Sequence, residues 1–164
     1  MKTMKQIFTA IFALILVTGI NFTSNAKDDS SSTVVEIAVA NSDFSTLVEA
    51  VTKANLVDAL SADGPFTVFA PTNAAFDKLF KQLGVSGIKD LSAEQLTPIL
   101  TYHVVSGQVM SGDLSNTSVA TLNGKKIKVD LSNGVHINES KVIKADIQGK
   151  NGVIHVIDTV LIPE

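Results

Sequence analysis

The sequence has 164 residues, 45% of them hydrophobic, with no cysteine and a formal net charge of −3 at pH 7. The lack of cysteine excludes disulfide bonds and a lipid-modified N-terminal cysteine, so packing alone must stabilise the fold. The 13 positive residues are all Lys, and 16 acidic residues outnumber them. Because phosphate recognition favours basic patches and Arg, we expect neither nucleic acid nor an anionic membrane surface as a partner.

The N-terminus has the order of a secretory signal peptide. Positive charges at Lys2 and Lys5 precede an apolar run over 7–20, and a small-residue cleavage site ends at Ala26. This run is shorter than the roughly 20 apolar residues that a membrane-spanning helix needs, so we expect no membrane insertion after cleavage. A signal peptide over 1–26 predicts a protein that is secreted or periplasmic.

The remaining chain divides into a linker and one domain. Residues 27–33 are Lys, Asp, Ser and Thr, which have nothing to bury, so we expect a short disordered linker. Residues 34–164 have the size and apolar content of a single compact domain.

The first half of the domain is mainly helical in its periodicity. Apolar residues recur at helical spacing within 43–54, which predicts one helix. The short β-prone run over 66–70 predicts a strand. Thr72 then caps a second helix, whose left-handed terminator is Gly84.

A third helical segment contains a proline. Ser92 and Gln95 form a capping-box pair, which predicts a helix start. Pro98 lacks the N–H that a continuous helix requires, so we predict a break before it. Thr97 would then cap a new helix with Pro98 at its first position.

The C-terminal third is typical of β-structure. Asn-Gly pairs at 123–124, 133–134 and 151–152 predict hairpin turns. Apolar and polar residues alternate over 126–131, the pattern of a half-buried strand, whereas 153–162 is apolar on both faces and predicts a strand between layers. Helices followed by an antiparallel meander predict the α+β class.

Three of these segments resemble the signatures of fasciclin domains. Residues 66–73 and 151–158 are similar to the paired signature segments of that family, and Tyr102-His103 between them, with apolar flanks, resembles its tyrosine-histidine motif. Their order and spacing agree over the whole of 34–163. The resemblance implies the fasciclin fold, a wedge of two mostly antiparallel β-sheets packed against N-terminal helices.

The resemblance also implies a function. Fasciclin domains act in cell adhesion and the extracellular matrix, usually without enzymatic activity, so we expect no catalysis and no cofactor. The implied partner is a cell-surface or matrix protein or polysaccharide. Tyr102 and His103 match one adhesive motif of the family, and Asp146 and Ile147 match a second, although the flanks of this pair differ from those of integrin-binding versions. These four are the predicted binding residues.

Each histidine has a structural interpretation as well. His103 lies on an apolar helix face and His155 in the most apolar strand, which favours hydrogen-bonded structural roles. Tyr102 has the stronger claim to the surface, because its ring and hydroxyl suit a contact. No two histidines have a short ligand spacing, so we expect no metal site.

Two alternative functions stay open at this point. The first is an exported carrier that binds a small molecule or lipid between the helices and the sheets, although the abundant Val, Ile and Leu can fill that space. The second is a hydrolase that uses His103 or His155 with a carboxylate, although no nucleophile motif accompanies them.

Overall fold

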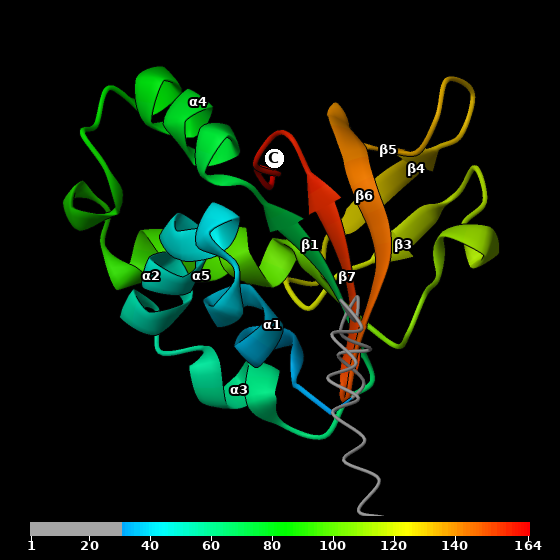
Figure 1. Ribbon diagram of the computed structural model, residues 1–164. Coiled ribbons are helices and arrows are strands. Elements are labelled where there is room, and N and C mark those ends of the chain that lie inside the picture. Colours follow the sequence, from blue (N-terminus) through cyan, green and yellow to red (C-terminus); the bar gives the residue numbers. More distant parts are fainter. Residues whose placement is uncertain (1–30) are drawn as a thin grey trace, which may run out of the picture.

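The computed structural model describes residues 31–164, so the predicted signal peptide lies outside the described residues. Figure 1 shows the helices gathered on one side of β1 and β7, with β3, β4 and β5 on the other side. The helices are α1 Val34–Ala40, α2 Ser45–Lys53, α3 Val57–Ser61, α4 Asn73–Leu83 and α5 Ala93–Tyr102. The strands are β1 Phe66–Pro71, β2 Val104–Ser106, β3 Ser118–Ala120, β4 Lys126–Asp130, β5 His136–Ile137, β6 Ser140–Gly149 and β7 Gly152–Ile157.

Side-chain caps define where the helices begin. A reciprocal capping box between Thr33 and Glu36 starts α1. The sequence analysis placed Thr33 at the end of the linker and assigned no structure to 34–40. Thr72 caps α4, and Gly84 ends it in the left-handed region at a φ of 67°, which confirms the prediction. The helix predicted over 43–54 is α2, preceded by one 3₁₀ turn.

The predicted helix break before Pro98 is wrong. α5 starts at the expected capping box and runs unbroken to Tyr102 with Pro98 inside it. Both Pro98 and Glu94, whose carbonyl loses its helical partner, are exposed, so water can satisfy that carbonyl. The Thr97 hydroxyl donates to the Ala93 carbonyl oxygen at 2.8 Å instead of capping a new helix.

The seven strands form the order β2-β1-β7-β6-β5-β4-β3. β1 and β7 are parallel, and every other neighbouring pair is antiparallel. The predicted α+β class is confirmed, and the two segments that resembled signature segments are the two strands of the parallel pair.

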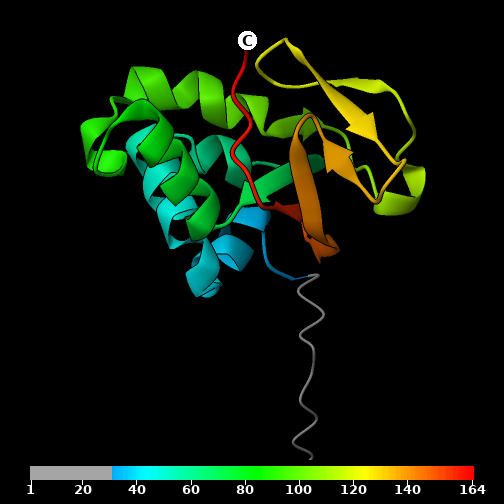
Figure 2. The same cartoon turned by 90° about the horizontal axis from the view of Figure 1, so that it is seen from above.

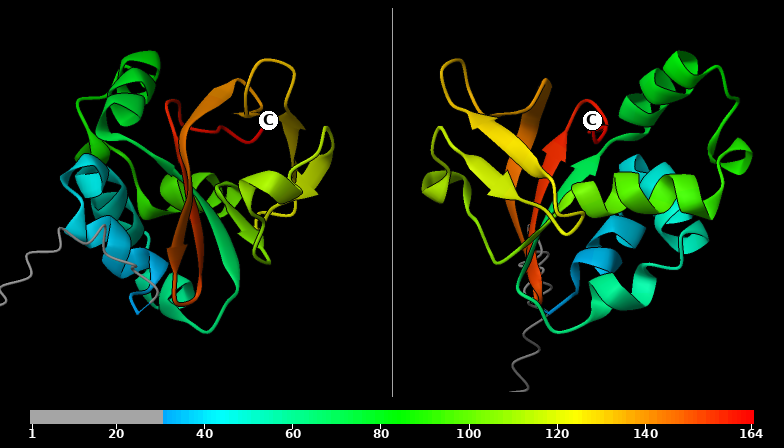
Figure 3. Two further views of the ribbon diagram at one scale, coloured as in Figure 1. Left: turned by 45° about the vertical axis from the view of Figure 1, so that its right-hand side comes forward. Right: turned by 180° about the vertical axis from the view of Figure 1, so that it is seen from behind.

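An irregular strand bends the sheet into a wedge. β6 pairs with β7 through two register shifts, one between Val142 and Lys144 and one between Lys144 and Ile147. Such bulges locally bend a strand and increase its twist. In Figures 2 and 3, β3, β4 and β5 accordingly splay away from β1 and β7.

The turn between β6 and β7 differs from the Asn-Gly turn expected at 151–152. Gly149 pairs with Gly152, so Lys150 and Asn151 form the turn and Gly152 is already in β7. A Cβ on Gly152 would lie 2.1 Å from the Phe66 carbonyl oxygen, so this glycine allows β1 and β7 to approach each other.

Two apolar cores follow from this arrangement. The helix-side core lies between the helices and the β1–β7 pair and includes Phe44, Leu47, Phe76, Leu79, Leu96 and Ile154. The wedge core lies inside the bent sheet and includes Phe69, Tyr102, Ile127, Val129, Ile137 and Ile157. The alternation predicted over 126–131 is confirmed in β4, where Ile127 and Val129 are buried.

Candidate functional site

The end of α5 places His103 in the interior. Its side chain is 2% exposed. Nδ1 donates to the Ile99 carbonyl oxygen at 2.7 Å, and Nε2 accepts the Leu161 backbone N–H at 2.9 Å. Because a carbonyl oxygen only accepts, the proton is on Nδ1, and the backbone occupies both ring nitrogens. The imidazole thus joins α5 to the C-terminal segment.

This environment keeps His103 neutral. Burial lowers the pKa of His103 to about 4, although its hydrogen bond to Ile99 acts in the opposite direction. With its basic lone pair used by Leu161, the ring can neither accept a proton from a substrate nor bind a metal in this conformation.

Tyr102 points into the wedge core and is 5% exposed. Its hydroxyl donates to the Lys126 carbonyl oxygen at 3.0 Å and accepts from the Asn138 side-chain amide at 3.1 Å. The expectation that Tyr102 offers its ring to a partner does not match this burial. The residue instead fixes β4 and the β5–β6 hairpin to the end of α5.

Asp146 lies in the irregular part of β6, with a φ of 59°. Its carboxylate accepts the backbone N–H of Ser111 at 2.7 Å and also the Ser111 hydroxyl. Burial alone would raise the pKa of Asp146, but the hydrogen bonds from Ser111 and the nearby His155 hold the pKa below its usual value. The carboxylate therefore anchors the connection between β2 and β3.

Ile147 follows Asp146 in the chain, and its side chain faces the helix-side core. It is partly buried, packs against the helix-side core and pairs with Ile154 of β7. Asp146 and Ile147 thus contact different parts of the fold: Asp146 binds Ser111, and Ile147 packs on the helix-side core. The two predicted pairs lie on different elements, Asp146 and Ile147 on β6 and Tyr102 and His103 at the end of α5. The binding roles of the four residues stay predictions.

His155 is buried beside Asp146. Its Nε2 donates to the Val109 carbonyl oxygen at 2.8 Å, and its Nδ1 accepts the Asp146 backbone N–H at 3.3 Å. Ser111, Asp146 and His155 are therefore neighbours without the connections of a catalytic triad, since the histidine contacts backbone groups at both nitrogens instead of the serine hydroxyl.

The structure reveals a surface feature that the sequence analysis did not assign. A groove of about 740 Å³ lies between the C-terminal segment and the start of β4, and its lining includes Lys125, Lys126, Lys128 and Asn138. The sequence signal for this groove is the alternation of Lys126 and Lys128 with two buried residues. From that alternation, the sequence analysis predicted only a strand with one solvent-exposed face. We call this feature the basic groove.

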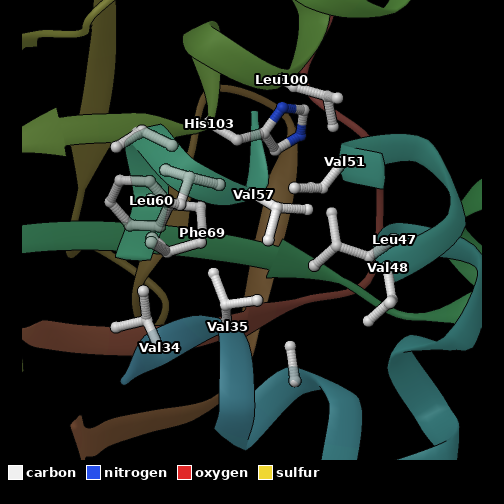
Figure 4. Close-up of a pocket in the computed structure, with 13 residues that line it drawn as sticks. Val34, Val35, Leu47, Val48, Val51, Val57, Leu60, Phe69, Leu100 and His103 are labelled. Atoms are coloured by element: carbon white, nitrogen blue, oxygen red, sulfur yellow. The ribbon is translucent and has the colours of Figure 1, made fainter. Parts of the chain in front are cut away.

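The space between the helices and the sheet is small. Figure 4 shows the cavity there, surrounded by side chains such as Val48, Val51, Val57 and His103. Its volume is about 40 Å³, whereas small-molecule pockets usually measure about 300–1,000 Å³. His103 is its one polar side chain, and both ring nitrogens already have partners, so the cavity suits neither a lipid nor a hydrogen-bonded water.

The described part of the chain contains neither a cluster of metal ligands nor a membrane-spanning helix. Within 31–164, no three His, Asp or Glu residues gather closely enough to hold a metal ion. Over the same residues, every helix is too short or too polar to cross a membrane.

Comparison with known proteins gives a consistent result. The family model described as "Fasciclin domain" matches residues 42–163. Protein sll1483 of Synechocystis is 48% identical over 141 residues, covering 85% of this chain and 78% of that protein. Transforming growth factor-beta-induced protein ig-h3 of Sus scrofa is 39% identical over 133 residues, covering 80% of this chain and 19% of that protein.

A solved structure agrees at the level of the fold. The domain pair from the insect cell adhesion molecule Fasciclin I superposes with a TM-score of 0.68 at 23% identity, covering 81% of this chain and 51% of that chain. The predicted wedge of strands packed against helices is therefore confirmed.

Proposed function

Because the chain belongs to the fasciclin domain family, we propose that it is an exported, non-catalytic adhesion module that binds a cell-surface or matrix protein or polysaccharide. The observation that carries this proposal is the state of the two buried histidines. In His103 and in His155, both ring nitrogens are hydrogen-bonded to backbone groups, so neither ring has a nitrogen free to act as an acid or base on a substrate. Since these two side chains serve the fold, we infer that the outer surface of the domain makes the contacts with a partner.

Two observations support export, one from the N-terminal sequence and one from similar proteins. The N-terminal sequence has the charge and apolar order of a signal peptide with a cleavage site after Ala26. Among similar proteins, MPB83 of Mycobacterium bovis is named a cell surface glycolipoprotein, and Fasciclin I is named an insect cell adhesion molecule. Mass spectrometry of the protein recovered outside the cytoplasm should find Lys27 as its first residue, whereas an intact N-terminus in that fraction would contradict cleavage.

Adhesion is tested by multivalent display. A single domain is expected to bind weakly, and linked copies raise the effective concentration. Beads coated densely with the processed protein should retain cells or matrix polymers, and sparsely coated beads should retain fewer. Beads coated with an unrelated acidic protein are the control. Equal retention by the control beads, or none by the dense ones, would contradict an adhesive role.

A further inference from the structure

The meander of β3 to β6, which supplies the lysines of the basic groove, stands out by its charge. Residues 118–144, which include β3, β4 and β5, contain five lysines and two carboxylates, although the chain as a whole is acidic. Residues 34–100, which include all of the helices except the end of α5, contain four lysines and eight carboxylates. The positive charge is therefore concentrated on the meander.

The backbone holds the lysines of β4 in a fixed pattern. Lys126 and Lys128 alternate with buried Ile127 and Val129, so both lysines project from the same, exposed face about 7 Å apart along the strand. β4 is paired on both sides, with Ser118 opposite Lys128 on β3 and with β5 on the other side. The positive charges are consequently presented on a rigid strand.

Asn138 adds a preorganised polar group to the groove. Its Oδ1 accepts the Lys128 backbone N–H at 2.8 Å, and its Nδ2 donates to the Tyr102 hydroxyl. These bonds explain how a non-glycine residue keeps a φ of 53° at the turn after β5. Tyr102, which also lines the groove, thus holds Asn138 in position there.

The other wall of the groove mixes polar and apolar groups. Ile162 is 46% exposed there, and Gln82 contributes an exposed side-chain amide. A sugar ring has apolar C–H faces and hydroxyl groups at its edges, so a wall of this kind suits a carbohydrate. Glu139 and Glu164 also line the groove and reduce its positive charge.

We propose that the basic groove binds one strand of an anionic polysaccharide, whose carboxylate or sulfate groups contact Lys125, Lys126 and Lys128. This inference rests on the proposed adhesive function and specifies the partner. A nucleic acid fits less well, because the chain contains no Arg and the aromatic ring at the groove, that of Tyr102, is buried. A membrane also fits less well, since the lysines line a groove next to one exposed apolar side chain and not an apolar face that could insert.

The test compares two charge-matched triple variants of the processed protein. One variant replaces Lys125, Lys126 and Lys128 with Gln, and the control replaces the exposed Lys81, Lys89 and Lys150 with Gln. Binding is measured at low salt on immobilised alginate, dextran sulfate and neutral dextran. The wild type should bind one or both charged polymers but not neutral dextran, and the two charged polymers distinguish carboxylate from sulfate recognition.

The groove variant should lose about 100-fold in affinity, because each lysine near an anionic surface contributes about a factor of five. The control variant should stay within about threefold of the wild type, and the thermal midpoints of all three proteins should agree within about 2 °C. Glu139→Gln, which removes a carboxylate from the groove, should strengthen binding.

Three results would overturn the assignment. They are equal losses in both triple variants, binding to neutral dextran as strong as to the charged polymers, and tighter binding to duplex DNA or to vesicles rich in phosphatidylserine. If beads coated with the groove variant still retain cells or matrix polymers, the adhesive function stands and only the groove assignment fails. If wild-type beads retain nothing at all, the adhesive function itself fails.

Discussion

The helix-side half of the molecule and the β3–β6 meander use their polar side chains differently. On the helix side, Asn151 accepts the Val34 N–H at 2.9 Å and donates to the carbonyl oxygens of Leu60 and Ala62, while His103 joins α5 to the C-terminal segment. In the meander, Lys126 and Lys128 project outward from a strand whose other face is buried. The polar groups of Asn151 and His103 therefore make hydrogen bonds within the fold, whereas the charges of Lys126 and Lys128 are exposed on the meander.

The largest effect on stability is expected at the parallel pair of β1 and β7. Gly152→Ala should destabilise the protein by about 4 kcal/mol or more, or prevent folding, because the new Cβ would lie 2.1 Å from the Phe66 carbonyl oxygen. Gly112→Ala is the control, since nothing lies within 4 Å of its Cβ position. Urea unfolding of both variants measures the difference. A Gly152→Ala protein as stable as the control would mean that β1 and β7 are not packed this closely.

A second test uses the neutral state of His103. Since burial depresses the pKa of His103 to about 4 from an unfolded value of about 6.5, the unfolded chain binds more protons between these two pH values. The stabilisation is therefore complete above about pH 6.5 and is lost as the pH falls toward 4. Between pH 7.5 and 5, the free energy of unfolding should fall by about 2 kcal/mol through this group.

The matched variants are His103→Gln and His136→Gln. Urea unfolding at both pH values should show a much smaller pH dependence for His103→Gln than for His136→Gln, whose side chain is half-buried in β5. The same pH dependence in all three proteins would mean that His103 is accessible to protons, contrary to its buried position.

Local signals explain what the sequence predicted correctly. The helix caps at Thr72 and Ser92 and the alternation in β4 depend on residues close together in the chain, so they can be recognised without the fold. The pairing of β1 with β7, the approach that requires Gly152 and the continuation of α5 through Pro98 depend on distant segments or on solvent. Asn138 was missed as part of a site for the same reason, since its partner Tyr102 lies 36 residues away.

Tyr102→Phe distinguishes the structural role of this residue from a contact role. It removes the hydroxyl that bonds to Lys126 and Asn138 but keeps the buried ring, so the free energy of unfolding should fall by about 1 kcal/mol. Because Asn138 loses one anchor and Lys128 keeps its exposed charge, binding to the charged polymer should weaken by no more than about threefold. A large loss of binding at unchanged stability would show that the Tyr102 hydroxyl itself contacts the partner.

The smallest expected effect concerns the cavity on the helix side. Val57 lines this space of about 40 Å³, so Val57→Ile can place its extra methyl group there and stabilise the protein by about 0.5–1 kcal/mol. Val39→Ile is the control, because Val39 is 62% exposed and the same added carbon should change stability little. Thermal and urea unfolding measure both. If Val57→Ile destabilises the protein while leaving its fold intact, the cavity is already closed in solution and the helices pack more tightly on the sheet than the static volume indicates.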